Sequence, residues 1–179
     1  MTPDASKEAF ARAGNIRLMI LDVDGVMTDG SIYLCDDGQE FKAFNTQDGL
    51  GMKLLKDSGV EVAIISGRTS RAATRRAEST GVSHYFQGVD DKLAAFLQLA
   101  GELGVAHEAC AFMGDDVVDL PPMRHCGLAI TVPAAPQLVK DHAHLVTTRE
   151  GGRGAVREAV EFIMQAQGTL DAGLSQYLK

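Results

Sequence analysis

The sequence has few cysteines, no excess of positive charge and no long apolar run. Its three cysteines, Cys35, Cys110 and Cys126, are scattered and odd in number, which argues against a disulfide framework or a CxxC metal site. This usage is typical of a reducing compartment, so we expect a cytoplasmic protein. No apolar run approaches the length that spans a bilayer, and residues 1–14 lack the apolar core of a signal peptide. A net charge of −7 argues against nucleic acid or an anionic membrane as partners.

Length and composition are those of an ordinary globular protein. With 179 residues, of which 45% are hydrophobic and 23% charged, the chain can bury a full core, and we expect one domain over residues 1–179. Residues 1–15 are expected to form a loosely held arm with a short helix over 6–13. The tail, residues 168–179, carries several apolar side chains, so we expect it to dock on a surface such as another subunit.

Strand-length apolar runs alternate with helical segments along the chain. This alternation predicts an α/β fold with a doubly wound, mostly parallel sheet. After the first strand, two short runs joined by Asp36-Asp37-Gly38 predict a small β-hairpin. Strands are expected over residues 16–21, 60–65, 84–86, 109–113, 127–132 and 143–147. Helices are expected to end near residue 57 and to span 70–80, 91–103 and 155–165.

Two carboxylates directly follow the first predicted strand. Asp22 and Asp24 stand one residue apart, and Gly25 comes next. Where the chain turns out of its strand, both acids can line the crevice at the strand's carboxyl end. Like charges held this close repel unless a cation or a shared proton lies between them, and Mg²⁺ prefers such oxygen ligands. A solvated Asp-Xaa-Asp-Gly turn would have the same sequence.

Further polar residues stand near the ends of later strands. Ser66 ends the second buried strand, where a hydroxyl and free backbone amides suit a phosphate. Lys92 stands in the first turn of a helix, where the helix dipole disfavours a cation unless an anion lies in front of it. Asp115 and Asp116 follow the third buried strand, and Asp119 comes one helical turn later. Because parallel strands end at a shared edge, these signals together predict one ligand site.

An arginine cluster lies in this otherwise acidic chain. Arg68 can bind two oxygens of an anion, and Arg76, eight residues later, can share its helical face, so both are ligand candidates. Arg71 and Arg75 are expected on a solvated face of the same helix. Asp48 is expected to cap the helix that follows the hairpin.

These motifs resemble those of haloacid dehalogenase superfamily phosphatases. That superfamily carries a DxDG sequence, an apolar strand ending in Ser or Thr, a lysine and a GDxxxD sequence. The matching segments here are residues 22–25, 65–67, 92 and 114–119. Nearly all of residues 16–167 is similar to the family of 3-deoxy-D-manno-octulosonate 8-phosphate phosphatases. The similar segments are LDVDGVMTDGSIYLCDDGQEFKAFNTQDGLG, IISGR, QGVDDKLAAF, GDDVVDLPPM and EGGRGAVRE.

The resemblance implies a capless, Mg²⁺-dependent phosphatase that forms a homotetramer and acts on this sugar-acid phosphate in lipopolysaccharide precursor synthesis. The short spacing after the DxDG sequence agrees, since it has room for a hairpin but not for a cap domain. Asp22 is implied as the nucleophile that forms an aspartyl phosphate, and Asp24 as the acid and base. Mg²⁺ is then held by Asp22, the backbone carbonyl of Asp24 and Asp115, with Asp116 and Asp119 in support.

The resemblance also implies ligands for both ends of the substrate. Ser66 and Lys92 hold the phosphoryl oxygens. For the sugar acid it points to Asn45, Thr46, Gln47, Asp48, Gly49, Lys53, Arg68 and Arg76, together with Asp24 and Lys92. Many relatives carry a basic residue where Gln47 stands. If that residue meets the substrate carboxylate, this protein uses another cation or prefers a different sugar.

Other functions remain open at this point. A phosphatase for a related nonulosonate 9-phosphate, of the sialic acid type, would use the same mechanism. A non-catalytic scaffold of the same fold is the second alternative, although a scaffold has no need of Asp22, Asp24, Lys92 and Asp115 together. A phosphotransferase or mutase would need a second acceptor site, usually in a cap.

Overall fold

The computed structural model describes residues 3–179, which fold around a six-stranded sheet. In sheet order its strands are β5 (His84–Phe86), β4 (Glu61–Ile65), β1 (Leu18–Leu21), β6 (Cys110–Met113), β7 (Leu128–Thr131) and β8 (Leu145–Val146). Every neighbouring pair is parallel. Because β1 lies between β4 and β6, the chain winds first to one side of β1 and then to the other. The predicted doubly wound parallel sheet is confirmed.

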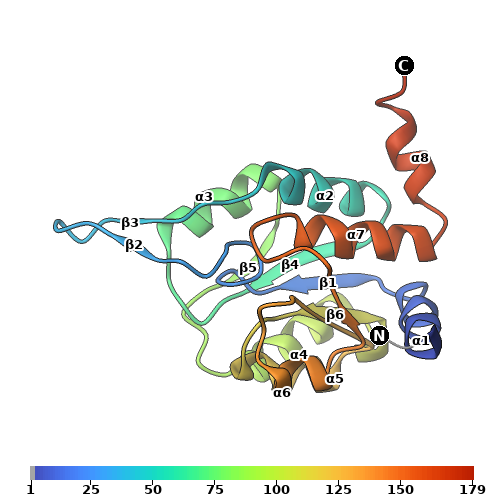
Figure 1. Ribbon diagram of the computed structural model, residues 1–179, viewed down its shortest axis with the longest axis horizontal. Coiled ribbons are helices and arrows are strands. Elements are labelled where there is room, and N and C mark those ends of the chain that lie inside the picture. Colours follow the sequence, from blue (N-terminus) through green and yellow to red (C-terminus); the bar gives the residue numbers. More distant parts are fainter. Residues whose placement is uncertain (1–2) are drawn as a thin grey trace.

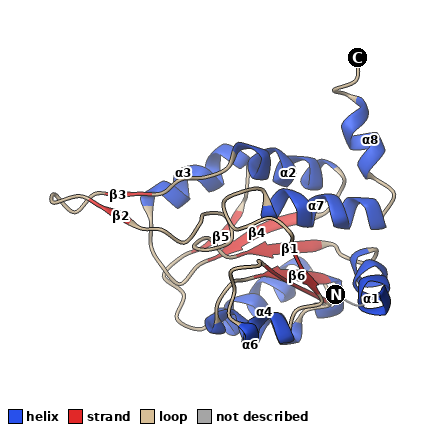
Figure 2. Ribbon diagram, viewed as in Figure 1, coloured by secondary structure: helices blue, strands red, loops and turns tan. Residues whose placement is uncertain are grey.

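Helices cover both faces of the sheet (Figure 1). One face carries α2 (Thr46–Asp57), α3 (Arg71–Thr80) and α7 (Ala155–Ala166), and the other carries α4 (Lys92–Leu103), α5 (Leu120–His125) and α6 (Gln137–Asp141). Short 3₁₀ turns stand at His107–Ala109 and Val117–Asp119. Figure 2 shows the strands enclosed between helices, and every residue of β1, β6 and β7 is buried. Burial on both faces explains why these strands are unbroken apolar runs.

The two terminal segments contact α7. α1 (Pro3–Ala13) buries Ala9 and Ala13 and sets the ring of Phe10 edge-on to Phe162, with centroids 5.6 Å apart. The small side chains of Ala9 and Ala13 allow this part of the expected arm to pack closely against the body of the protein; residues 1–2 lie outside the described part. α8 (Leu170–Ser175) also packs on α7. Within residues 3–179, no helix combines the length and apolarity needed to cross a membrane.

The predicted hairpin is present between β1 and α2. Its strands, β2 (Tyr33–Leu34) and β3 (Glu40–Phe41), pair in antiparallel fashion. The hairpin projects away from the body of the protein, at the far left of Figure 1. Tyr33, Leu34 and Phe41 are 56%, 72% and 55% exposed. Such an apolar cluster on a projecting ribbon is typical of an interaction surface.

Side chains cap the starts of α2, α3 and α4. Ser70 and Asp91 cap α3 and α4, and Gly81 closes α3 in the left-handed conformation. The prediction that Asp48 caps α2 is wrong. The helix starts at Thr46, and the side chain of Asn45 forms the cap, because the chain enters helical geometry before it reaches Asp48.

Candidate active site

The expected polar residues meet at the carboxyl edge of the central strands. Asp22 follows β1, Ser66 follows β4, and the segment 114–119 follows β6. At β1 the winding direction of the sheet reverses, and open α/β sheets bind ligands at such a point. Gly114 lets the last segment fold back tightly, since a Cβ at this position would lie 2.3 Å from Cβ of Asp119. The fold thus gathers side chains from distant parts of the sequence.

Lys92 forms a buried ion-pair triad with two of these carboxylates. Its Nζ lies 2.9 Å from Oδ2 of Asp22 and 2.6 Å from Oδ1 of Asp119. Burial opposes the charge of Lys92, but the two carboxylates outweigh burial and raise the pKa of the lysine. Lys92 is the first residue of α4, so these carboxylates supply the anion expected at that helix start. A cation fixed at this depth can hold phosphoryl oxygens.

Three carboxylates form a group suited to a metal ion. Asp22, Asp115 and Asp119 each offer an oxygen, and these oxygens lie within 4.8 Å of one another. Burial and then the neighbouring carboxylates raise the pKa of Asp22 to about 6 and that of Asp115 to about 7. Both shifts show that the ionised form of these carboxyl groups is disfavoured at this position. A divalent cation would stabilise that form. The donors are all hard oxygens, so the group fits Mg²⁺.

Asp119 is better suited to support the site than to bind the metal. Its Oδ2 accepts hydrogen bonds from the backbone N–H groups of Asp115 and Asp116, and its Oδ1 accepts one from Lys92. Asp116 caps the 3₁₀ turn, with its carboxylate bonded to the N–H of Val117 at 2.7 Å. These bonds engage both carboxylate oxygens of Asp119 and one of Asp116 within the protein itself.

Asp24 and Ser66 flank this group. Ser66 is buried, and its Oγ accepts from the backbone N–H of Arg68 at 3.3 Å. Asp24 is 20% exposed and pairs with Lys42 and Arg68 rather than with Lys92. The sequence patterns did not single out Lys42 or Glu40. Their spacing of two residues, which places both side chains on one face of an extended segment, was the available signal.

Curated relatives match nearly the whole chain. The sequence is 45% identical over 171 residues to 3-deoxy-D-manno-octulosonate 8-phosphate phosphatase KdsC of Escherichia coli K12, covering 96% of this chain and 91% of that protein. It is 46% identical over 170 residues to the Yersinia pestis protein of the same name, covering 94% and 91%. A family model described as haloacid dehalogenase-like hydrolase matches residues 48–127. The chain belongs to the haloacid dehalogenase-like hydrolases.

Solved structures extend the likeness to the whole fold of this hydrolase. The Moraxella catarrhalis 3-deoxy-D-manno-octulosonate 8-phosphate phosphatase, crystallised with magnesium, phosphate and KDO, superposes with a TM-score of 0.94 at 43% identity, covering 96% of this chain and 98% of that chain. The cobalt-bound Haemophilus influenzae phosphatase gives a TM-score of 0.89 at 39% identity, covering 94% and 99%. The resemblance seen in the motifs is thereby confirmed at the level of the family.

Residues 45–49 and Arg76, which are expected to bind the sugar acid, lie at the start of α2, whereas Arg68 lies beyond the end of β4 and pairs with Asp24 and Glu40. Arg76 reaches from α3 to donate a hydrogen bond of 2.6 Å to the backbone carbonyl of Asn45. It lies so close to Gly49 that a Cβ there would be 2.2 Å from Nη2 of Arg76. Burial lowers the pKa of Arg76, although Asp48 opposes the shift. The hydrolase thus holds this arginine firmly against the loop that leads into α2.

Other members of the expected set differ in their surroundings. Asp48 is buried, and its carboxylate accepts a hydrogen bond of 2.8 Å from the backbone N–H of Arg157 in α7. Gln47 is exposed, and its Oε1 accepts a hydrogen bond of 3.1 Å from Arg149. Thr46 and Lys53 are exposed on α2. Arg149, which the sequence did not single out, is therefore the cation beside Gln47.

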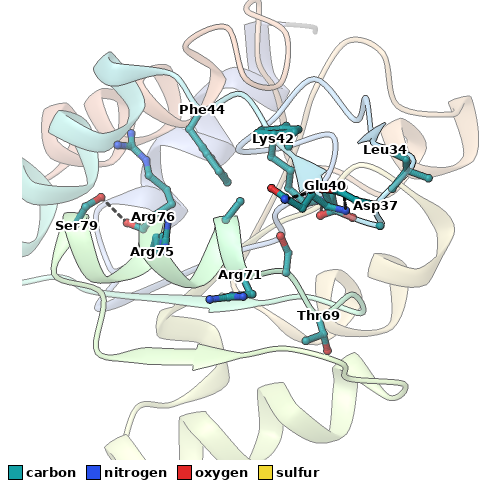
Figure 3. Close-up of a pocket in the computed structure, with 15 residues that line it drawn as sticks. Leu34, Asp37, Glu40, Lys42, Phe44, Thr69, Arg71, Arg75, Arg76 and Ser79 are labelled. Carbon is teal, nitrogen blue, oxygen red and sulfur yellow. Dashed lines mark hydrogen bonds and ion pairs between the residues drawn. The ribbon is translucent and has the colours of Figure 1, made fainter.

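A groove of about 1080 Å³ opens between the hairpin and α3, next to this set. Figure 3 shows Glu40 and Lys42 entering it from the hairpin, with Arg75 and Arg76 on the side of α3. A smaller cavity of about 320 Å³ is lined by residues such as Gly25, Asp115 and Arg153. Arg75 is exposed, as expected, and it also lines the larger groove.

Proposed function

We propose that this hydrolase removes phosphate from 3-deoxy-D-manno-octulosonate 8-phosphate in an Mg²⁺-dependent reaction. The observation that carries the proposal is the group formed by the buried Asp22, Lys92 and Asp119 and the partly buried Asp115 at the switch point of the sheet. Relatives at 45% identity over nearly the whole chain bear the name of that phosphatase. Among the described elements, only the hairpin is inserted between β1 and α2, so the site has no cap domain there.

The chemistry follows from the positions of the side chains. Asp22 attacks phosphorus in line, the bond to the sugar oxygen breaks, and an aspartyl phosphate forms. Asp24 gives a proton to the departing oxygen and later takes one from the water that attacks the aspartyl phosphate. Ser66 and Lys92 hold the phosphoryl oxygens. Mg²⁺, held by Asp22, Asp115 and the backbone carbonyl of Asp24, supplies positive charge that offsets the charge of the phosphoryl group.

The sugar acid is held at the start of α2. Its ligands are Asn45, Thr46, Gln47, Asp48, Gly49, Lys53, Arg68 and Arg76. Arg149 provides a cation beside Gln47, with its Nη1 3.1 Å from Oε1 of Gln47. This arrangement supports octulosonate 8-phosphate, whose carboxylate needs such a cation. A nonulosonate 9-phosphate of the sialic acid type, which also carries a carboxylate, is the second candidate, because Gln47 itself supplies no positive charge.

The remaining parts of the proposal concern assembly and setting. The exposed apolar side chains of the hairpin support a homotetramer of single-domain subunits. The excess of acidic residues supports an enzyme that acts on small molecules, without nucleic acid or membrane partners, and the three scattered cysteines support a cytoplasmic setting. With octulosonate 8-phosphate as its substrate, the enzyme would act in lipopolysaccharide precursor synthesis.

The test is phosphate release with Mg²⁺ from a panel of sugar phosphates. We expect octulosonate 8-phosphate to be turned over far faster than the others and Asp22→Asn to abolish turnover. Asp57→Asn, an exposed aspartate at the end of α2, is the matched control and should behave as wild type. Preference for a nonulosonate phosphate would preserve the mechanism and move the specificity to Gln47. Absence of any hydrolysis would favour the scaffold alternative.

A further inference from the structure

Four charged side chains form a closed ring at the mouth of the site. Lys42 Nζ contacts Oδ1 of Asp24 and lies 3.4 Å from Oε1 of Glu40. Arg68 donates to Oε2 of Glu40 at 2.8 Å, and its Nε lies 3.6 Å from Oδ2 of Asp24. The ring therefore joins the segment that follows β1, the hairpin and the end of β4 through side chains alone.

The members of the ring are not equally buried. The side chain of Lys42 is 0% exposed, whereas that of Arg68 is 49% exposed. A fully covered ammonium group is costly unless it is paired, so Lys42 is fixed on its two carboxylates. Arg68 is half in solvent and lies at a longer distance, so it can leave Asp24 when a ligand enters. Lys42 is thus the rigid contact of Asp24, and Arg68 is the exchangeable one.

We propose that Lys42 is a positioning residue that fixes the carboxylate of Asp24 for proton transfer to the leaving oxygen. Lys42 contacts Oδ1 of Asp24, and Oδ2 of Asp24 faces Arg68. When Arg68 moves away, Oδ2 is free to face the substrate. In the first step the bond from Asp22 to phosphorus forms, the bond from phosphorus to the sugar oxygen breaks, and a proton passes from Asp24 to that oxygen. Asp24 stands in a turn between β1 and the hairpin, where a short side chain needs a second contact to keep one orientation.

The inference rests on the proposed phosphatase reaction and uses the leaving group as its readout. A sugar alkoxide leaves only with a proton, whereas p-nitrophenolate leaves without one. The value of kcat/KM reports the formation of the aspartyl phosphate. A loss of kcat/KM for the sugar phosphate alone therefore indicates a defect in proton delivery, whereas a loss for both substrates indicates a defect in another function of the site. We expect Lys42→Met to lower kcat/KM for octulosonate 8-phosphate about 100-fold, and for p-nitrophenyl phosphate less than about threefold. Lys42→Arg, which keeps the charge, should recover part of the loss.

Matched variants keep the test decisive. Lys56→Met is the control, because Lys56 also binds an oxygen, the carbonyl of Gly81, but lies outside the site; both substrates should be unaffected. If Lys42→Met does not fold, Lys42→Gln, which keeps most of the stem, is measured in its place. Equal losses for the two substrates would reveal a purely structural role and overturn the inference. A wild-type protein inactive on every phosphate ester would overturn the proposed function, and this inference with it.

Discussion

At the scale of the residue, Gly25 sets how closely Asp115 approaches the turn that carries Asp22 and Asp24. Gly25 has a φ of +83°, and a Cβ at this position would lie 2.0 Å from Oδ2 of Asp115. A side chain would therefore push the Asp115 carboxylate away from the metal group. Because glycine has no Cβ, Gly25 can adopt the left-handed backbone conformation and also lets Asp115 approach this closely.

Gly25→Ala is expected to weaken Mg²⁺ binding. Displacement of one metal ligand should raise the Mg²⁺ concentration for half-maximal activity by about tenfold or more. Gly38→Ala is the matched control, since Gly38 has a φ of +81° with nothing within 4 Å of the added Cβ. Both variants should lose about 1 kcal/mol of stability through backbone strain, measured by urea unfolding. An unchanged Mg²⁺ requirement in Gly25→Ala would contradict this account of the site.

At the scale of the element, the strands and helices around the site follow from local pattern. β1, β6 and β7 are short apolar runs because both of their faces are covered, and their carboxyl ends meet because they are parallel. The positions of Asp22, Ser66, Lys92 and Asp115 at one edge were therefore predictable from the sequence.

Contacts between elements were beyond such reasoning. Lys42 meets Asp24 across 18 residues, and Asp48 meets the backbone of Arg157 across 109 residues. Each contact depends on how a hairpin or helix is oriented against its neighbour, and local periodicity does not record that orientation. For the same reason Asp48 was predicted as a helix cap of α2, although its carboxylate turns toward α7.

The C-terminal tail provides a test at this scale. α8 packs on α7, but Tyr177 and Leu178 beyond it are 56% and 85% exposed. We expect these apolar residues to cover the site of a neighbouring subunit. Deletion of residues 176–179 should then lower kcat/KM about tenfold for octulosonate 8-phosphate and much less for p-nitrophenyl phosphate, which needs little enclosure.

A second deletion controls for folding. Removal of residues 169–179 also takes away α8 and its contacts with α7, so it should lower the free energy of unfolding as well as activity. The shorter deletion leaves these contacts in place and should keep the wild-type midpoint of urea unfolding. An equal loss of activity toward both substrates in the shorter deletion would argue against closure of a neighbouring site.

At the scale of the whole molecule, the carboxylate group links stability to pH and to Mg²⁺. Burial and neighbouring carboxylates raise the pKa of Asp22 to about 6 and that of Asp115 to about 7, from an ordinary value of 3.8. At pH values between 3.8 and about 6 to 7, these two carboxyl groups keep their protons in the folded protein but have lost them in the unfolded chain. The contribution of these two groups to the free energy of unfolding is fully present below about pH 4 and is lost as pH rises through about 6 to 7.

Bound Mg²⁺ should reverse this loss, because it compensates the carboxylates once they ionise. We expect Mg²⁺ to raise the melting temperature over that in EDTA by several degrees near pH 8 and by little near pH 5. Other carboxyl groups, such as those of Asp29 and Glu8, have lowered pKa values and change stability in the opposite direction as pH falls. Only the difference between Mg²⁺ and EDTA therefore isolates the metal group. Asp115→Asn should abolish most of that difference, and an Mg²⁺ effect of equal size at both pH values would show that the cation acts elsewhere.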